Sequence, residues 1–285
     1  MTISVASGKG GTGKTTVATN LALALNDNVQ FLDCDVEAPN AFIFLKPTLN
    51  DVKPVYSFFP QVIEEKCNFC GLCSKICEWN AIAVVNKKWL FFPQLCHSCS
   101  ACWQLCPEKA LKKEKKLKGV VQKGKAFGID FVQGKLTVGE AVSPPVIKAV
   151  KKEINKEKIV IIDVAPGTGC PMVEGVKESD FCILVTEPTP FGFNDLILAI
   201  GVLKELTIPF GVVINRSDIG DDKVEDFCRK NNIPVLLRLP FDRKIARAYS
   251  EGKAIVKEDK SWKEKFIELF EKIKEEYQNT ERAKV

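Results

Sequence analysis

The chain has 285 residues, 46% of them hydrophobic, which suits one large domain or one domain with a small insert. Twelve cysteines would indicate disulfides only in a small secreted protein, so we expect a cytoplasmic protein with metal-bound thiolates. The formal net charge is +5, and no run approaches ~20 apolar residues. We therefore expect no membrane span, and we find no signal-peptide pattern.

The first 50 residues predict a strand, a glycine loop, a helix and a second strand. Residues 3–6 form the first apolar run, 15–25 are rich in Ala and Leu, and 29–32 form the second apolar run. This βαβ order is typical of a parallel sheet. We interpret Pro54 and Pro60 as breaks in the pattern.

Cysteine replaces apolar periodicity from Cys67 to Pro107, and a lysine-rich run at 112–118 closes that stretch. Such a charge run is typical of a solvated linker. Residues 119–139 alternate around glycines and predict hairpin strands. Further buried strands are predicted at 159–164, 181–186, 210–214 and 233–237. Helices are predicted at 145–154, 193–206 and 223–230.

The predicted sheet starts before the cysteine-rich stretch and resumes after it, so this stretch is an inserted module. We predict an α/β fold with a mostly parallel sheet, formed by residues 1–60 and 112–285. A small α+β domain is inserted between them at 61–111.

A phosphate loop follows the first strand and satisfies the pattern G-x-x-x-x-G-K-S/T, so the predicted sheet is of the P-loop NTPase type. Its glycines let main-chain N–H groups wrap phosphates, and the following helix adds its positive end. Lys14 should reach the β- and γ-phosphates of ATP, and the Thr15 hydroxyl should bind Mg²⁺. The predicted ATP-binding residues of the loop are Gly8, Lys9, Gly10, Gly11, Thr12, Gly13, Lys14, Thr15 and Thr16.

The run from Lys9 to Thr16 resembles the deviant Walker A motif of the MinD, ParA, nitrogenase iron protein and Mrp superfamily of ATPases. In that superfamily the extra lysine crosses a dimer interface to the partner's nucleotide. The resemblance therefore implies an ATP-dependent homodimer, in which Lys9 acts beside the catalytic residues Lys14 and Asp35. Asp195, which follows Thr186-Glu187-Pro188, resembles the aspartate that meets the partner's lysine.

Further motifs carry the same resemblance. Residues 33–40 resemble switch I, 161–167 resemble the Walker B and switch II segments, and 240–252 resemble the closing loop. The resemblance implies that Asp35 orients the attacking water and that Asp163 holds Mg²⁺ through water. It also implies that the Gly167 N–H senses the γ-phosphate and that Asn215 contacts adenine. The simpler alternatives are a polar strand end for Asp33 and Asp35, a turn residue for Asn215 and a helix N-terminal acid for Asp195.

Two four-cysteine runs, Cys67-x2-Cys70-x2-Cys73-x3-Cys77 and Cys96-x2-Cys99-x2-Cys102-x3-Cys106-Pro107, have the spacing of ferredoxins with two 4Fe-4S clusters. In that pattern the fourth cysteine of each run binds the other cluster. We assign one cluster to Cys67, Cys70, Cys73 and Cys106, and the second to Cys77, Cys96, Cys99 and Cys102. The alternative is two four-cysteine zinc sites, against which the third regularly placed cysteine argues.

The cysteine-rich stretch resembles the ferredoxin domain inserted in a subgroup of the MinD superfamily. One departure is Glu78, which stands where ferredoxins usually have proline; no ligand is lost. Two clusters of about −2 each would lower the formal charge to about +1. We therefore do not expect nucleic acid as a partner.

The remaining cysteines have simpler interpretations. We expect Cys34, Cys182 and Cys228 to be buried as small hydrophobic residues. We expect Cys170, which follows switch II, to be a packed loop thiol; the alternative is that two copies face each other in a dimer, with a bridging metal, cluster or redox role. We expect His97 to be a solvated loop residue.

An apolar stripe near the C-terminus indicates a helix packed on the sheet, not on a membrane. Its members are Trp262, Phe266, Leu269, Phe270, Ile273 and Tyr277.

Three functions are compatible with these features. The first is ATP-gated electron transfer through the two clusters to an unidentified redox partner. The second is a metal-cluster carrier or scaffold like Mrp-type proteins, although those use a C-terminal Cys-x2-Cys and this chain has no cysteine after Cys228. The third is a positioning switch of the MinD or ParA kind, which needs a membrane helix or a DNA surface.

Overall fold

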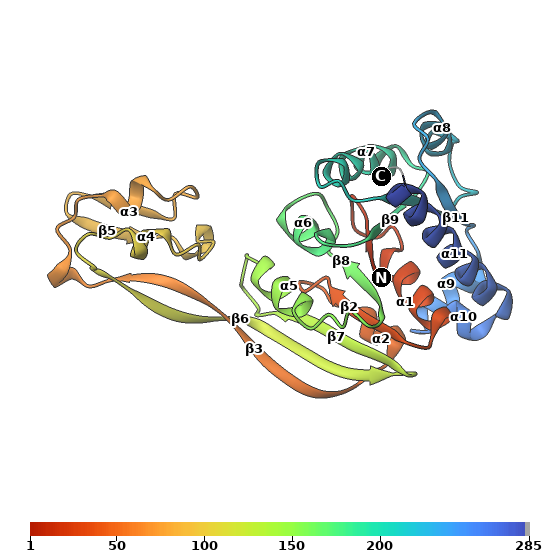
Figure 1. Cartoon of the computed structure of the whole chain (residues 1–285), viewed down its shortest axis with the longest axis horizontal. Helices are drawn as coiled ribbons and strands as arrows, with labels where there is room; N and C mark the ends of the chain where they lie inside the picture. Colours follow the sequence, from red (N-terminus) through yellow and green to blue (C-terminus); the bar gives the residue numbers. More distant parts are fainter. Residues whose placement is uncertain (283–285) are drawn as a thin grey trace.

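The computed structural model describes residues 1–282, which form a large sheet with helices on both faces and a small lobe at one end (Figure 1). The nine strands of the sheet have the order β11-β10-β9-β1-β8-β2-β7-β6-β3. Neighbours from β11 to β7 pair in parallel, and β6 and β3 are added antiparallel at one edge. The predicted α/β class with a mostly parallel sheet is confirmed.

The strand bounds agree with the expected runs in the parallel part of the sheet. They are β1 (Thr2–Ala6), β2 (Val29–Cys34), β7 (Ile129–Leu136), β8 (Ile159–Val164), β9 (Phe181–Thr186), β10 (Phe210–Asn215) and β11 (Val235–Leu239). Only β11 begins two residues later than the apolar run at 233–237 predicts.

Side chains that alternate along each strand feed two separate cores. Ile161 of β8 packs in a cluster with α1 (Lys14–Leu25), α10 (Ile255–Glu258) and α11 (Lys260–Arg282). Its neighbour Ile162 packs in the other cluster, among helices of the opposite face. The helices of that face are α5 (Pro144–Lys151), α6 (Cys170–Val176), α7 (Pro190–Glu205) and α8 (Lys223–Lys230).

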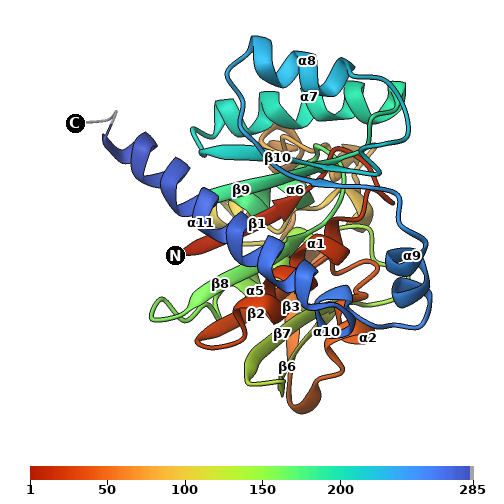
Figure 2. The same cartoon turned by 90° about the vertical axis from the view of Figure 1, so that its right-hand side faces the viewer.

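The C-terminal helix α11 crosses the face of the sheet that also carries α1 (Figure 2). The first five residues of the predicted stripe are buried in the core, and Tyr277 packs against it. The expected docking of this helix on the sheet is confirmed. Within residues 1–282, no helix combines the length and apolar character needed to cross a membrane.

The edge of the sheet corrects two expectations. Pro54 and Pro60 do not break the pattern, because both lie within β3 (Thr48–Val62), a 15-residue strand. Proline lacks an N–H donor, and an outermost strand tolerates it because one side of that strand has no partner strand. The lysine-rich run at 112–118 is not a linker, because it lies within β6 (Leu111–Ala126) and pairs with β3 along its length.

Beyond Val62 and Leu111, the chain between β3 and β6 folds into the small lobe seen at the left of Figure 1. A hydrogen bond from the Ile63 N–H to the Ala110 carbonyl (2.8 Å) closes its base. The lobe contains one hairpin, β4 (Ile82–Val85) with β5 (Lys88–Phe91), and two short helices, α3 (Leu72–Lys75) and α4 (Ala101–Gln104). The remaining helices, α2 (Ala41–Leu45) and α9 (Arg243–Ser250), belong to the main body.

Candidate nucleotide site and cysteine cavities

The phosphate loop connects β1 to α1, as its sequence predicts. Two of its glycines are required by close contacts. A Cβ atom on Gly8 would lie 2.2 Å from the carbonyl oxygen of Asp195, and one on Gly13 would lie 2.4 Å from Nδ2 of Asn215. Gly13 also has a φ angle of 92°, which only glycine adopts at low cost. The loop is therefore packed against two elements distant in sequence, α7 and the end of β10.

Four predicted catalytic and magnesium-binding side chains meet at the base of the loop. The Lys14 Nζ lies 2.9 Å from Asp163 Oδ1 and 3.3 Å from Asp35 Oδ2. The Thr15 hydroxyl donates to Asp163 Oδ2 at 2.6 Å. These residues come from α1, from the end of β8 and from the segment after β2. The parallel strands bring them together because their carboxyl ends meet at one edge.

Burial and like charges make this cluster electrostatically unusual. Burial raises the pKa of Asp35 and, with the nearby Asp163 carboxylate, raises that of Asp33 well above its usual range. Burial opposes the charged form of Lys14, but Asp163 and Asp35 outweigh it and raise the pKa of this ammonium. Three carboxylates around one ammonium form a site of excess negative charge, which suits a divalent cation carried with phosphates.

Asp33 has a structural task that its sequence position did not reveal. Its two carboxylate oxygens accept hydrogen bonds from the N–H groups of Asp35 and Ala41, each at 3.1 Å. The carboxylate thereby ties both ends of the switch I segment to β2. The interpretation of Asp33 as a polar strand end is therefore too simple.

The predicted γ-phosphate sensor and adenine contact both lie at the loop. The Gly167 N–H donates to the Ser7 carbonyl at 2.9 Å, which connects the switch II segment to the end of β1. Asn215 donates from Nδ2 to the Thr12 carbonyl at 2.9 Å. Both residues are thus hydrogen-bonded beside the phosphate loop, and their roles toward ATP stay predictions.

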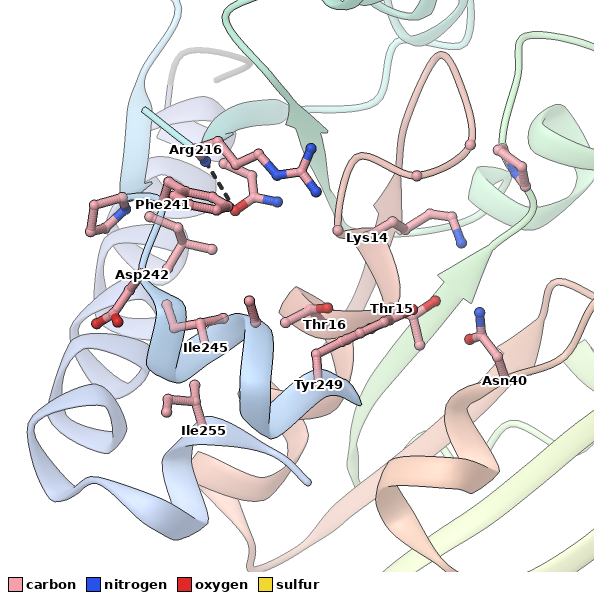
Figure 3. Close-up of a pocket in the computed structure, with 18 of the residues that line it drawn as sticks. Lys14, Thr15, Thr16, Asn40, Arg216, Phe241, Asp242, Ile245, Tyr249 and Ile255 are labelled. Carbon is pink, nitrogen blue, oxygen red and sulfur yellow. Dashed lines mark hydrogen bonds between the residues drawn. The ribbon is translucent and has the colours of Figure 1, made fainter. Parts of the chain in front are cut away.

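A cavity of about 310 Å³ extends from the phosphate loop (Figure 3). Its polar end is lined by Lys14, Thr15 and Asn40, and its other end by α9 and the segment before it. The apolar lining of that end is Phe241, Ile245, Tyr249 and Ile255. The volume falls within the range of small-molecule sites, and a polar end joined to an apolar end suits a phosphorylated nucleoside.

Sequence reasoning missed part of this lining. Ile245 and Tyr249 stand four residues apart on α9, so one face of that helix closes the cavity. This spacing was the available signal. Arg216 was also missed; its guanidinium lies 3.0 Å from Glu187 Oε1.

Lys9 and Asp195, which are predicted to act at a dimer interface, have other neighbours within the chain. Lys9 Nζ lies 3.9 Å from Glu187 Oε2, so its carboxylate neighbour within the chain is Glu187 and not Asp195. Asp195 instead lies against the loop through its main chain, close to Gly8. Contact of Lys9 and Asp195 across a dimer stays a prediction.

The eight cysteines of the two runs line two cavities in the small lobe. Each cavity contains one of the ligand sets assigned from spacing. The first is lined by Cys67, Cys70, Cys73 and Cys106, and the second by Cys77, Cys96, Cys99 and Cys102. Within residues 1–282, no three His, Cys, Asp or Glu side chains are arranged to hold a single metal ion.

Hydrogen-bond donors point at the sulfurs in both cavities. The N–H of Ala81 donates to Cys77 Sγ at 3.2 Å, and that of Ala110 donates to Cys106 Sγ at 3.3 Å. Trp103 lines the second cavity, and its Nε1 is buried without a hydrogen-bond partner in the described part of the chain. Donors of this kind stabilise thiolate and sulfide charge around iron–sulfur clusters, so the residues fit that group.

The expectations for the four remaining cysteines and for His97 are confirmed only in part. Cys34, Cys182 and Cys228 are buried, as expected. Cys170 is exposed at the start of α6, so the expectation of a packed thiol is wrong. His97 is exposed, but its ring stacks on Trp79 with the centroids 4.4 Å apart, so it is not free in solvent.

Comparison with known proteins agrees with this site. Residues 3–255 match the family model described as the CobQ/CobB/MinD/ParA nucleotide binding domain. An uncharacterized protein of Methanocaldococcus jannaschii is 32% identical over 90% of this chain and 92% of its own length. An iron-sulfur cluster carrier protein of Pyrococcus horikoshii is 26% identical over 95% of this chain and 84% of its own length.

The fold is also similar to a solved structure. The cell division ATPase MinD of Pyrococcus furiosus aligns with a TM-score of 0.59 and 22% identity, over 96% of this chain and 98% of that one. At that identity, the likeness concerns the fold alone.

We predict that Lys14→Ala abolishes ATP binding, whereas Asp35→Ala affects hydrolysis alone. Lys14→Ala removes a phosphate contact and leaves Asp35 and Asp163 facing each other, so ATP binding should be lost. Asp35→Ala should retain binding but slow hydrolysis by roughly 10²–10⁴-fold, because it removes only the group that orients water. Equilibrium binding of a fluorescent ATP analogue and phosphate release measure the two effects. Normal turnover by Asp35→Ala would show that the switch I assignment is wrong.

Proposed function

The chain belongs to the CobQ/CobB/MinD/ParA family of nucleotide-binding proteins and is an ATPase of the MinD/ParA type. We propose that it couples an ATP-dependent dimer switch to electron transfer through two 4Fe-4S clusters. The observation that carries the proposal is the pair of cavities in the lobe, each lined by four cysteines drawn from both runs.

The two cysteine sets would hold the clusters as resident groups, in a reducing cytoplasm. A 4Fe-4S cluster supplies one-electron chemistry, and its potential depends on hydrogen bonds to sulfur and on solvent exposure. The protein contributes the N–H donors of Ala81 and Ala110 and the indoles of Trp89 and Trp103, which line the cavities. These groups lie in the lobe, whereas the nucleotide site lies in the main body. Coupling the two therefore requires a path of contacts between them.

A chain of contacts joins the nucleotide site to the base of the lobe. The carbonyl of Val36, next to Asp35, accepts a hydrogen bond from the Leu136 N–H at 2.8 Å. The N–H of Thr137 donates to the carbonyl of Lys118 on β6 at 2.9 Å. Switch I is thereby two hydrogen-bonded steps from the ribbon that carries the lobe.

Glu140 adds two ion pairs between the segment after β7 and the strand β6. Its carboxylate pairs with Lys118 at 2.5 Å and with Lys116 at 2.7 Å. Burial opposes ionisation, but the two lysines outweigh it and lower the pKa of Glu140. The Lys118 side chain is 2% exposed, and breaking a buried pair is costly, so the loop and the ribbon should move together.

A second candidate is supported by the relatives. The Pyrococcus horikoshii protein and several others at 25–26% identity over most of this chain are named iron-sulfur cluster carrier proteins. In a carrier, the clusters are cargo that leaves the chain, whereas in electron transfer they stay bound. Release of iron to an apo-acceptor in the presence of Mg-ATP would favour the carrier function.

We predict about eight iron and eight sulfide per chain after anaerobic purification, measured by metal analysis and visible absorbance. Cys67→Ala should lose about half of the iron, because it removes one ligand of one cluster. Cys170→Ala is the matched control, since this exposed thiol lies outside both cavities, and it should keep all of the iron. Stoichiometric zinc with no visible absorbance contradicts the assignment.

We predict that Mg-ATP changes the EPR spectrum of the reduced clusters and that Glu140→Gln abolishes this change while ATP hydrolysis continues. The substitution removes the charge that holds Lys116 and Lys118 to the loop. Glu153→Gln is the control, because Glu153 pairs with Lys53 and Lys123 at the other end of the ribbon. An equal ATP response in wild type and Glu140→Gln would exclude this route.

We predict an ATP-dependent dimer, most stable in Asp35→Ala, that Lys9→Ala weakens without loss of ATP binding. Lys9 is partly exposed beside the loop, where a second subunit would bring its nucleotide phosphates. Sedimentation velocity with and without Mg-ATP measures the association. A protein that remains monomeric at high concentration, or dimerises equally without nucleotide, does not use a dimer switch.

A further inference from the structure

The ribbon of β3 and β6 has one face that its own protein leaves uncovered. Opposite pairs in an antiparallel ribbon share a face, and the pairs Tyr56–Leu117 and Phe58–Lys115 lie on the same side. The apolar members Tyr56, Phe58 and Leu117 are 39–44% exposed. Ser57 and Phe59, which alternate with them, are at most 5% exposed. We call this exposed surface, together with Lys113 on the same strand face, the outer ribbon face.

The lysines of the outer ribbon face are not engaged in ion pairs within the described residues. Lys113 and Lys115 form no ion pair with any carboxylate in residues 1–282, and each lies over an aromatic ring. Lys116 and Lys118, by contrast, both pair with the carboxylate of Glu140. Unpaired ammonium groups beside exposed apolar side chains are typical of a surface that binds an acidic partner.

The charge of the chain is concentrated in the same region. Residues 61–118 contain ten lysines and five glutamates, an excess that equals the formal charge of +5 for the whole sequence. The rest of the protein is therefore balanced. Two bound clusters would offset most of this excess within the lobe, but their sulfur ligands lie in the cavities and not on the outer ribbon face.

The outer ribbon face ends at the second cysteine cavity. Pro60, which pairs with Lys113, lines that cavity, as does Trp103. The Lys113 Nζ lies 5.5 Å from the centre of the Trp103 ring. A protein bound on this face would therefore lie beside the cavity that holds Cys77, Cys96, Cys99 and Cys102.

We propose that the outer ribbon face is the docking site for an acidic one-electron carrier protein. The proposal rests on the proposed function, because the partner would exchange one electron with the cluster of the second cavity. In the exchange the partner's centre is oxidised by one electron and the cluster is reduced by one, or the reverse. Lys113 and Lys115 would steer the partner, and Tyr56, Phe58 and Leu117 would form the contact.

The observations favour a protein over the other possible occupants. A nucleic acid needs many basic contacts along its backbone, and this face offers two unpaired lysines. A second copy of the chain would place these lysines against an equally basic surface, because a symmetric contact repeats the same patch. Weak redox encounters instead use small interfaces with charge steering.

Calorimetric titration of the full chain with oxidised flavodoxin, an acidic FMN protein, tests the proposal without turnover. We expect binding that weakens between about 50 mM and about 500 mM salt, because screening removes the steering charges. Lys113→Glu combined with Lys115→Glu should weaken binding by about tenfold or more and remove the salt dependence. Phe58→Ser should weaken binding at both salt concentrations.

The matched control is Lys125→Glu combined with Lys135→Glu, which reverses two exposed charges on the same edge of the sheet away from the lobe. It should change the affinity less than twofold. Equal loss in both double variants, or loss of oligonucleotide binding or of self-association in place of flavodoxin binding, overturns the proposal.

Iron content and reduction by dithionite, measured on the same samples, distinguish a failure of the docking site from a failure of the proposed function. Loaded clusters that dithionite reduces, with no flavodoxin binding, reject the docking site but keep the proposed function. Face-dependent binding to a chain without iron supports the docking site and rejects the proposed function.

Discussion

The antiparallel edge of the sheet is the constraint on which the whole arrangement depends. The parallel strands from β10 to β7 are each paired on both sides, and the ends of β2 and β8 lead to Asp35 and Asp163. The insert lies between β2 and β7 in the sequence, but its long strands β3 and β6 are added outside β7, with β3 outermost, and continue past the body to carry the lobe. The insert therefore adds cysteine chemistry at a distance from α1 and from the ends of β2 and β8, which place Lys14, Asp35 and Asp163.

Local motifs were predictable from the sequence, and contacts between distant segments were not. The phosphate loop and the two cysteine sets follow from spacing alone, because each geometry is set within a few residues or by a repeated pattern. The ribbon was missed because prolines and lysines are poor strand formers away from an edge. The burial of Lys118 depends on Glu140, 22 residues away, so no window around the lysine run could indicate it. Likewise, Glu187 becomes a neighbour of Lys9 only through the order of the strands.

Charge balance explains why the nucleotide site can act as a switch. Lys14 lies between Asp35 and Asp163, which offset its charge from two different segments. Phosphates and a divalent cation would compete for all three groups, so binding must redistribute these contacts. Asp163 is fixed within β8, whereas Asp35 lies just beyond the end of β2, where the chain is held by Asp33. The response to nucleotide is therefore expected on the Asp35 side.

The position of Asp35 beyond the end of β2 also determines the route by which a nucleotide-dependent movement could reach the lobe. Val36 follows Asp35 and is hydrogen-bonded to Leu136, so displacement of switch I acts first on the end of β7 and then on the loop that holds Lys118. The lobe itself stands away from the main body at the end of the ribbon (Figure 1). From Tyr56–Leu117 to Val62–Leu111 the ribbon is paired without a register shift, and this register cannot slip without breaking many bonds, so a displacement at the base of the ribbon would be carried to its far end. In the proposed function, a rearrangement beside Asp35 would reorient the cysteine cavities through this route, without direct contact between them and ATP.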